Sequence, residues 1–251
     1  MSALGTLTRT EATLFARNPQ NLFMGLLFPA VLLLVQGLII PGTDNPVDAG
    51  GAEFAGLRVI DLFVPIALTV AMATVSLTNF PSAIGGYREN GVLRRLGATP
   101  AGAGRILLAQ LAVSATTLTA GATIAVAAAI MVLGATTPGN VPLVCGAFAL
   151  GATSLLSLGA VVAARAGSAQ KANATGTLLL FASLFTAGVW TPGPLMPGVL
   201  RTISAYTPLG AASKVLTAAW YSQPTPWIQV VVMAAGTAGF SWIAVRTFRW
   251  K

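Results

Sequence analysis

Long apolar runs recur along this chain, and they restrict its fold more than any other feature. A helix needs about 20 apolar residues to cross a bilayer, and runs of that length alternate here with short polar segments. Hydrophobic residues make up 55% of the sequence and charged residues only 8%, against roughly 25% charged in an ordinary soluble domain. No water-soluble globule of 251 residues could bury so much apolar surface. The sequence therefore predicts an all-α membrane protein.

The apolar runs predict six transmembrane helices within a single transmembrane domain, residues 1–251. We expect three further helical segments that do not cross the membrane. Residues 1–20 form an N-terminal interfacial helix or, alternatively, a frayed terminus, and residues 86–100 form a short amphipathic helix. The proline-rich residues 191–226 form short outer helices that dip into the membrane or lie on its surface. The expected spans are residues 21–40, 59–85, 105–133, 141–164, 174–190 and 227–245.

Aromatic residues bracket the proline-rich segment, as is typical of the lipid headgroup level. These residues are Trp190, Tyr206, Trp220, Tyr221 and Trp227.

The segment 86–100 is the most densely charged part of the chain. Val92, Leu93 and Leu96 recur at helical spacing, with Arg94 and Arg95 between them. Glycines at 91 and 97 limit the helix on both sides. This pattern indicates a short amphipathic helix with a basic surface, held between the second and third spans.

Basic residues set the expected orientation, because they collect on the cytoplasmic side of membrane proteins. Most of them fall in the segments between spans two and three, between spans four and five, and at the two ends of the chain. An even number of spans then places both termini in the cytoplasm. The net charge of +8 would suggest nucleic acid in a soluble protein, but this rule explains it here without such a partner.

The sequence offers little material for catalysis or metal binding. Histidine is absent, Cys145 is the only cysteine, and no lysine follows a glycine as in the phosphate-binding loop G-x-x-x-x-G-K-S/T. We therefore expect no catalytic residue, metal or cofactor in this chain.

Three local motifs, together with the order of the spans, resemble the membrane (permease) subunit of a type-2 ATP-binding-cassette exporter. The first motif is Glu11 followed by Arg17-Asn18-Pro19 before the first span. The second is the stretch from Arg88 to Leu96 followed by Ala98-Thr99-Pro100. The third combines Leu195-Met196-Pro197 with Tyr206-Thr207-Pro208-Leu209.

The resemblance implies that segment 86–100 is a coupling helix, which docks into a groove on a separate P-loop ATPase subunit. Two ATPase copies would bind ATP and Mg, and two copies of this chain, most simply a homodimer, would enclose the pathway. Val92, Leu93 and Leu96 would form an apolar ridge for the groove, and Arg94 and Arg95 would pair with carboxylates of the ATPase. The alternative is that these arginines only anchor the loop to membrane lipid.

The residues to which the resemblance assigns coupling are Arg88, Glu89, Gly91, Val92, Leu93, Arg94, Arg95 and Leu96. Glu11 and Arg17 would support them from the interfacial helix, and Glu89 is expected to bond locally, to Arg17 or Arg88.

By the same resemblance, the second and fifth spans line the substrate pathway. The alternative role for each candidate is ordinary packing between helices. Few charges occur within the spans, which favours export of a hydrophobic or amphipathic small molecule, such as a drug, an antibiotic or a lipid-like compound, from a bacterial cell. The candidates are Thr74, Thr78, Asn79, Thr177, Phe181, Phe185 and Trp190.

Two other classes compete with this interpretation. An ion-coupled secondary transporter usually needs an ionisable group at mid-membrane, and Asp61, the one candidate, lies near the outer boundary of its span. The other class is a membrane protein of immunity or structural type that transports nothing.

Overall fold

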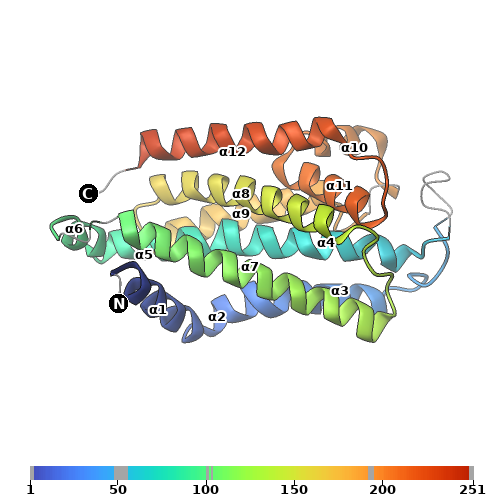
Figure 1. Ribbon diagram of the computed structural model, residues 1–251, viewed down its shortest axis with the longest axis horizontal. Helices are drawn as coiled ribbons and strands as arrows, with labels where there is room; N and C mark the ends of the chain where they lie inside the picture. Colours follow the sequence, from blue (N-terminus) through green and yellow to red (C-terminus); the bar gives the residue numbers. More distant parts are fainter. Residues whose placement is uncertain (1–2, 48–55, 100–101, 103, 192–194, 249–251) are drawn as a thin grey trace.

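The computed structural model describes residues 3–47, 56–99, 102, 104–191 and 195–248. Within these ranges every regular element is a helix, and one isolated β-bridge joins Pro46 to Arg58. The long helices run side by side along one axis (Figure 1). This arrangement confirms the predicted all-α membrane protein.

The helices are α1 (Ala3–Ala16), α2 (Pro19–Leu22), η1 (Phe23–Leu27), α3 (Phe28–Ile39), α4 (Val59–Thr74), η3 (Val75–Asn79), α5 (Phe80–Glu89), α6 (Val92–Gly97), α7 (Gly104–Leu133), α8 (Val141–Arg165), α9 (Ala169–Ala187), α10 (Gly198–Ser204), α11 (Pro208–Trp220) and α12 (Trp227–Thr247).

In the part of the chain that the structure describes, five helices are long and apolar enough to cross a membrane. They agree with predicted spans one to four and six. Predicted span five corresponds to α9, whose 19 residues extend about 28 Å. Gln170, Lys171 and Asn173 in its first turns give α9 a lower hydropathy than the others. The five spans are Pro19–Ile39, Val59–Glu89, Gly104–Leu133, Val141–Arg165 and Trp227–Thr247.

The continuous helix Val59–Glu89 is the centre of the bundle. In its most apolar stretch 94% of the residues are buried, whereas the figure for Trp227–Thr247 is 17%. A helix that is apolar on all sides is surrounded by other helices, and α7, α8, α9 and α11 pack around this one. Movement of the central helix therefore affects most of the bundle.

Two of the spans contain a π segment, and the sequence explains both. η1 lies directly before Phe28-Pro29, and η3 lies directly before Phe80-Pro81. Proline has no N–H, and its ring clashes with the carbonyl group four residues earlier. A local π turn is one of the ways in which a membrane helix accommodates this clash.

The carbonyl groups that these prolines displace face glycines of neighbouring helices. A Cβ atom on Gly121 of α7 would lie 2.3 Å from the Gly25 oxygen, and one on Gly176 of α9 would lie 1.7 Å from the Leu77 oxygen. Any side chain at either glycine would collide with backbone. Small residues thus permit the close helix packing that is typical of membrane bundles.

The two ends of the bundle differ in charge. We call one the basic end; it contains α1, α6, the end of α8, the start of α9 and the end of α12 (left in Figure 1). The described cations of the elements near this end are Arg9, Arg17, Arg88, Arg94, Arg95, Arg105, Arg165, Lys171 and Arg246. Those carried by the start of α4, by α10 and by α11 are Arg58, Arg201 and Lys214.

The opposite end contains the two short helices predicted between the prolines, α10 and α11. α11 is inserted among α4, α8, α9 and α12. Trp220 at its end is only 1% exposed and donates a 3.0 Å hydrogen bond from Nε1 to the Thr136 oxygen. The Trp220 ring is therefore packed inside the bundle, whereas Trp227 is 71% exposed.

Candidate functional site

The candidate site is a junction at the basic end, formed by the last turn of α5. Tyr87, Arg88 and Glu89 are consecutive, and consecutive helical residues point about 100° apart. Each of the three side chains therefore reaches a different neighbour. Three residues after Glu89, at Val92, α6 begins.

Tyr87 connects the junction to α1. Its hydroxyl donates a hydrogen bond to Oε2 of Glu11, which is only 4% exposed. Burial raises the pKa of the Glu11 carboxyl above its usual range, and the bond from Tyr87 opposes that rise. Glu11 is thus part of the junction, through a tyrosine that the sequence analysis did not nominate.

Arg88 connects the junction to the end of α8. Its Nη1 donates a 2.8 Å hydrogen bond to the Ala163 oxygen and a second, shorter one to the Ala166 oxygen. The last carbonyl groups of a helix have no partner within it, so the guanidinium supplies one. The same guanidinium lies 5.2 Å from the ring centroid of Phe248, which follows α12.

Glu89 connects the junction to the start of α9. Its Oε2 accepts a 3.1 Å hydrogen bond from the Ala169 N–H, and a carboxylate is favourable at a helix N-terminus. The sequence analysis expected Glu89 to bond to Arg17 or Arg88. The structure instead pairs it with the Ala169 N–H. Arg17 is exposed, while the neighbouring Asn18 caps α2 through a 3.1 Å bond from the Asn21 N–H to its side chain.

α6 follows a turn at Gly91, whose φ of 66° lies in the left-handed region that favours glycine. Leu93 is 2% exposed and packs with Phe80, Ile84 and other residues of the same chain. The predicted three-residue ridge is therefore wrong at Leu93, because this side chain points inward and secures α6 to the bundle. Arg94 and Arg95 are exposed and face outward, while Val92 and Leu96 are half-buried and pack in part against the same cluster as Leu93.

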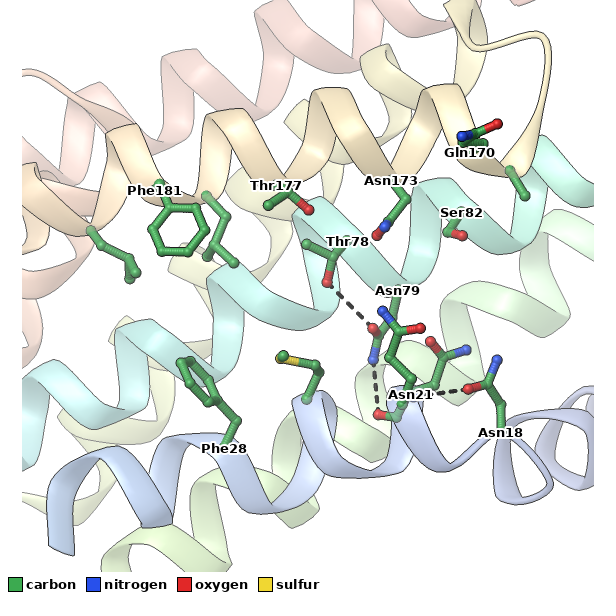
Figure 2. A pocket seen from close by; sticks show the side chains of 15 residues that line it. Asn18, Asn21, Phe28, Thr78, Asn79, Ser82, Gln170, Asn173, Thr177 and Phe181 are labelled. Carbon is green, nitrogen blue, oxygen red and sulfur yellow. Dashed lines mark hydrogen bonds between the residues drawn. The ribbon is translucent and has the colours of Figure 1, made fainter. Parts of the chain in front are cut away.

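A cavity of about 320 Å³ lies between the first two spans and α9 (Figure 2). It adjoins both π segments. Asn79 donates a 3.2 Å hydrogen bond from Nδ2 to the Asn21 oxygen, so the start of the first span is bonded to η3 at the cavity wall. The lining residues are Asn18, Gln20, Asn21, Met24, Phe28, Thr78, Asn79, Ser82, Ala169, Gln170, Asn173, Thr177, Leu180, Phe181 and Leu184.

The cavity is amphipathic. Carboxamide and hydroxyl groups of Asn18, Ser82 and Asn173 lie toward one side, and the rings of Phe28 and Phe181 lie toward the other (Figure 2). Of the described residues that line it, none is charged. Such a cavity can hold an uncharged ligand with one polar and one apolar part.

The structure brings four of the seven predicted pathway residues together in this cavity: Thr78, Asn79, Thr177 and Phe181. Thr74 is not among them, because it is fully buried and its Oγ1 bonds to the Val70 and Ala71 oxygens. Phe185 and Trp190 lie outside the cavity and form a ring contact, with centroids 6.3 Å apart.

Sequence reasoning missed Tyr87 at the junction and the amide residues Asn18, Asn21 and Asn173 at the cavity. Tyr87 is separated from Glu11 by 76 residues, and no local pattern connects them. A signal for the amides did exist, because asparagine is unusual in so apolar a chain and these residues lie at the same end of their spans.

A bundle of apolar helices, with a short basic helix held at one end, defines an integral membrane protein. The sequence matches the family model of the ABC-2 type transporter over residues 2–221. The chain therefore belongs to the ABC-2 type transporter family and is the membrane subunit, or permease, of an ABC transporter. No match was found among curated proteins.

Proposed function

We propose that this permease works in an ATP-driven exporter, with α6 as the coupling helix that docks on a separate P-loop ATPase subunit. One observation carries the proposal: the turn before α6 is bonded to α1, α8 and α9 through Tyr87, Arg88 and Glu89. A displacement of α6 would be passed to three helices at once. An anchor that only held the loop on lipid would not require these bonds.

The proposed motor consists of two ATPase copies, which bind ATP and Mg and draw together. Two copies of this chain, as a homodimer, would enclose the pathway between them. Closure of the motor would then bring the two α6 helices together and shift the bundle between inward-open and outward-open forms, as a rigid-body transition.

Docking would use the outward-facing part of α6. Arg94 and Arg95 are exposed and present two cations to carboxylates of the ATPase, with Val92 and Leu96 beside them. Leu93 has a different role, because it is buried against the bundle. It would prevent α6 from tilting freely, so that force on α6 moves α5.

We further propose that the basic end faces the cytoplasm of a bacterial cell and that both termini lie there. Basic residues outnumber acidic ones at this end among the described residues, which is the usual inside pattern. The opposite end, with α10 and α11, would face outward.

The cavity has a polar side and an apolar side, so we propose that the substrate is amphipathic as well. Polar groups of a drug, antibiotic or lipid-like molecule would bond to the carboxamides near Asn173, and its apolar part would contact Phe28 and Phe181. Export of such compounds would give the cell resistance to them. Thr177 of α9 and Asn79 of η3 would contact the substrate from two sides.

An ion-coupled transporter is less well supported, because Asp61 is already engaged. Its carboxylate pairs with Arg58 and accepts a 3.2 Å hydrogen bond from the Thr136 N–H. These bonds give Asp61 a structural role, because they join the start of α4 to the segment that follows α7. A non-transporting role would leave the cavity and the exposed part of α6 without a purpose.

Co-purification of the tagged chain with its ATPase tests the docking proposal. The double variant Arg94→Glu/Arg95→Glu reverses the two exposed charges of α6, so we expect it to lose most of the bound ATPase while keeping its helical content. The matched control is Arg201→Glu/Lys214→Glu, which reverses two exposed charges at the opposite end. Full retention of the ATPase by the α6 variant, or equal loss in both variants, contradicts docking through α6.

A further inference from the structure

A second cavity, of about 480 Å³, lies between α8 and α9 at the basic end, and we call it the groove. Arg165, the last residue of α8, and Lys171, in the first turn of α9, are the charged residues that line it. Leu158, Val161 and Leu179 line it further into the bundle. The groove is thus basic toward the end of the bundle and apolar along its depth.

The depth of the groove follows from the two helices that form it. Leu158 lies seven residues before Arg165 on α8, and Leu179 lies eight residues after Lys171 on α9. At 1.5 Å per residue, both walls extend about 10 Å from the cations into the apolar part of the bundle. Thr175 and Ala174 are exposed within this region, so the groove is open along its side.

Among the residues that the structure describes, no carboxylate lines the groove to neutralise its two cations. Glu89 is bonded to the first residue of α9, where its Oε2 accepts the Ala169 N–H, and it does not line the groove. Two cations beside one another, at the end of an apolar groove in a membrane protein, match a ligand with an anionic head and an apolar chain.

We propose that this groove binds one anionic phospholipid. Its phosphate would lie between Arg165 and Lys171, and an acyl chain would follow the walls formed by Leu158, Val161 and Leu179. The assignment goes beyond the transport function, because it concerns a lipid that stays bound and does not depend on which substrate is carried.

The groove also adjoins the junction. Ala166 lines the groove, and its carbonyl oxygen accepts a hydrogen bond from Arg88. A bound lipid would therefore contact the segment between α8 and α9 that Arg88 and Glu89 hold. Lipid occupancy and the position of α5 are linked through this one segment.

The test uses the full chain, purified in detergent and freed of lipid, then titrated with phosphatidylglycerol and with phosphatidylcholine of the same acyl chains. Native mass spectrometry counts the lipids bound per chain. We expect one tightly bound phosphatidylglycerol. Arg165→Gln/Lys171→Gln should weaken its binding about 30-fold, the effect of two cations near an anionic headgroup, and should leave phosphatidylcholine unchanged.

Two further variants distinguish the effect of the two cations on lipid binding from the effect of the room in the groove. Ala174→Trp keeps both cations but fills the groove, so it should reduce the binding of both lipids. Arg9→Gln/Arg17→Gln removes two exposed cations from the same end but outside the groove, and it should change phosphatidylglycerol binding less than about two-fold. Circular dichroism of each variant verifies that its helices are intact.

The proposal is overturned if Arg165→Gln/Lys171→Gln binds phosphatidylglycerol as tightly as the original chain, or if the Arg9 and Arg17 variant loses as much. Competition by glycerol phosphate is a separate arm of the test. If this headgroup alone displaces the lipid at equal concentration, the groove binds free anions and the lipid assignment is wrong.

Discussion

The two ends of the bundle are held together in opposite ways. At the opposite end, bonds from several segments converge on the single guanidinium of Arg58. It pairs with Asp61 at 3.4 Å and with Asp44 at 3.2 Å, and its Nη2 donates to the oxygens of Leu133 and Gly134 at 3.2 and 2.9 Å. At the basic end, one turn of α5 instead distributes its bonds to separate helices.

This difference indicates which end can move. Converging bonds must all break before the segments around Arg58 separate, so the opposite end is suited to remain fixed. Bonds that diverge from Tyr87, Arg88 and Glu89 can carry their partners along as α5 shifts. If α6 is the coupling helix, as proposed, the basic end would receive its motion while the opposite end stays fixed.

The largest effect is expected from Arg58→Met, which keeps the long stem but removes the cation. Asp61, only 1% exposed, would then be buried without its ion pair. Loss of one partner from such a pair costs about 3 kcal/mol of the free energy of unfolding. Unfolding of the detergent-solubilised chain by increasing SDS, followed by circular dichroism, measures this loss.

Asp44→Asn is the control for this variant, because the Asp44 side chain is 83% exposed and its ion pair is screened. It should change the free energy of unfolding by less than about 1 kcal/mol. If both variants cost the same, the opposite end is not held by a buried pair, and the contrast between the two ends does not hold.

The next effect concerns the central helix that connects the two ends. Gly176→Ala would place a Cβ atom 1.7 Å from the Leu77 oxygen in η3 and force α9 away from it. We expect a loss of about 2 kcal/mol in the free energy of unfolding. Gly146→Ala in α8 is the matched control, because a Cβ there meets nothing within 4 Å, so it should be neutral or slightly stabilising.

If Gly176→Ala is as mild as Gly146→Ala, the close approach of α9 to η3 does not exist, and motion of the central helix would not reach α9 through that contact.

The spans and the short helices could be predicted from the sequence because they depend on local patterns. Apolar runs set the long helices. The short helix predicted over residues 86–100 is shorter in the structure, because residues 86–89 continue α5 and α6 begins only after the turn at Gly91. α9 begins five residues earlier than the predicted span, at Ala169, because Ser168 caps it through a bond from the Lys171 N–H and Glu89 accepts the Ala169 N–H. Neither of these two hydrogen bonds can be predicted from a hydropathy pattern.

The contacts of the candidate site were harder to predict, because they join residues far apart in the chain. Helical spacing placed Leu93 on an apolar face but could not show whether that face meets the bundle or a partner. Glu11 interrupts the apolar face of its helix, and the reason is a tyrosine 76 residues away. Of the residues predicted for the substrate pathway, Thr78 and Thr177 line the cavity, whereas Thr74 is fully buried and does not.

A smaller effect is expected at the basic end, from Arg88→Lys. A lysine keeps the charge but lacks the fork with which arginine reaches several acceptors. The oxygens of Ala163 and Ala166 would lose part of their hydrogen bonding, at a cost of about 1 kcal/mol. Arg9→Lys, at an exposed position of α1, is the control and should be neutral in the same SDS titration.

A cost for Arg88→Lys equal to that of Arg58→Met would show that the basic end is also held by converging bonds. In that case the proposed division into a fixed and a movable end would be wrong.

The smallest effect is a pH dependence at the bond between α1 and the junction. Because burial raises the pKa of Glu11 above its ordinary value of 4.5, the folded chain binds this proton more tightly than the unfolded chain does. The stabilisation is complete below the unfolded pKa and is lost as pH rises through the folded pKa. Thermal unfolding should therefore show stability that falls as pH increases from about 4.5, and Glu11→Gln should remove that part of the slope.

Tyr87→Phe gives the sharper test, because the Tyr87 hydroxyl bonds to the Glu11 carboxylate and holds its pKa down. Without this bond the folded pKa rises further, so the loss of stability should extend to higher pH than in the original chain. In the double variant Tyr87→Phe with Glu11→Gln, no carboxyl remains, and the slope should be as flat as with Glu11→Gln alone. If the pH dependence of stability persists in Glu11→Gln, another group is titrating. In that case the bond between Tyr87 and Glu11 would not be one of the contacts that connect the junction to its neighbouring helices.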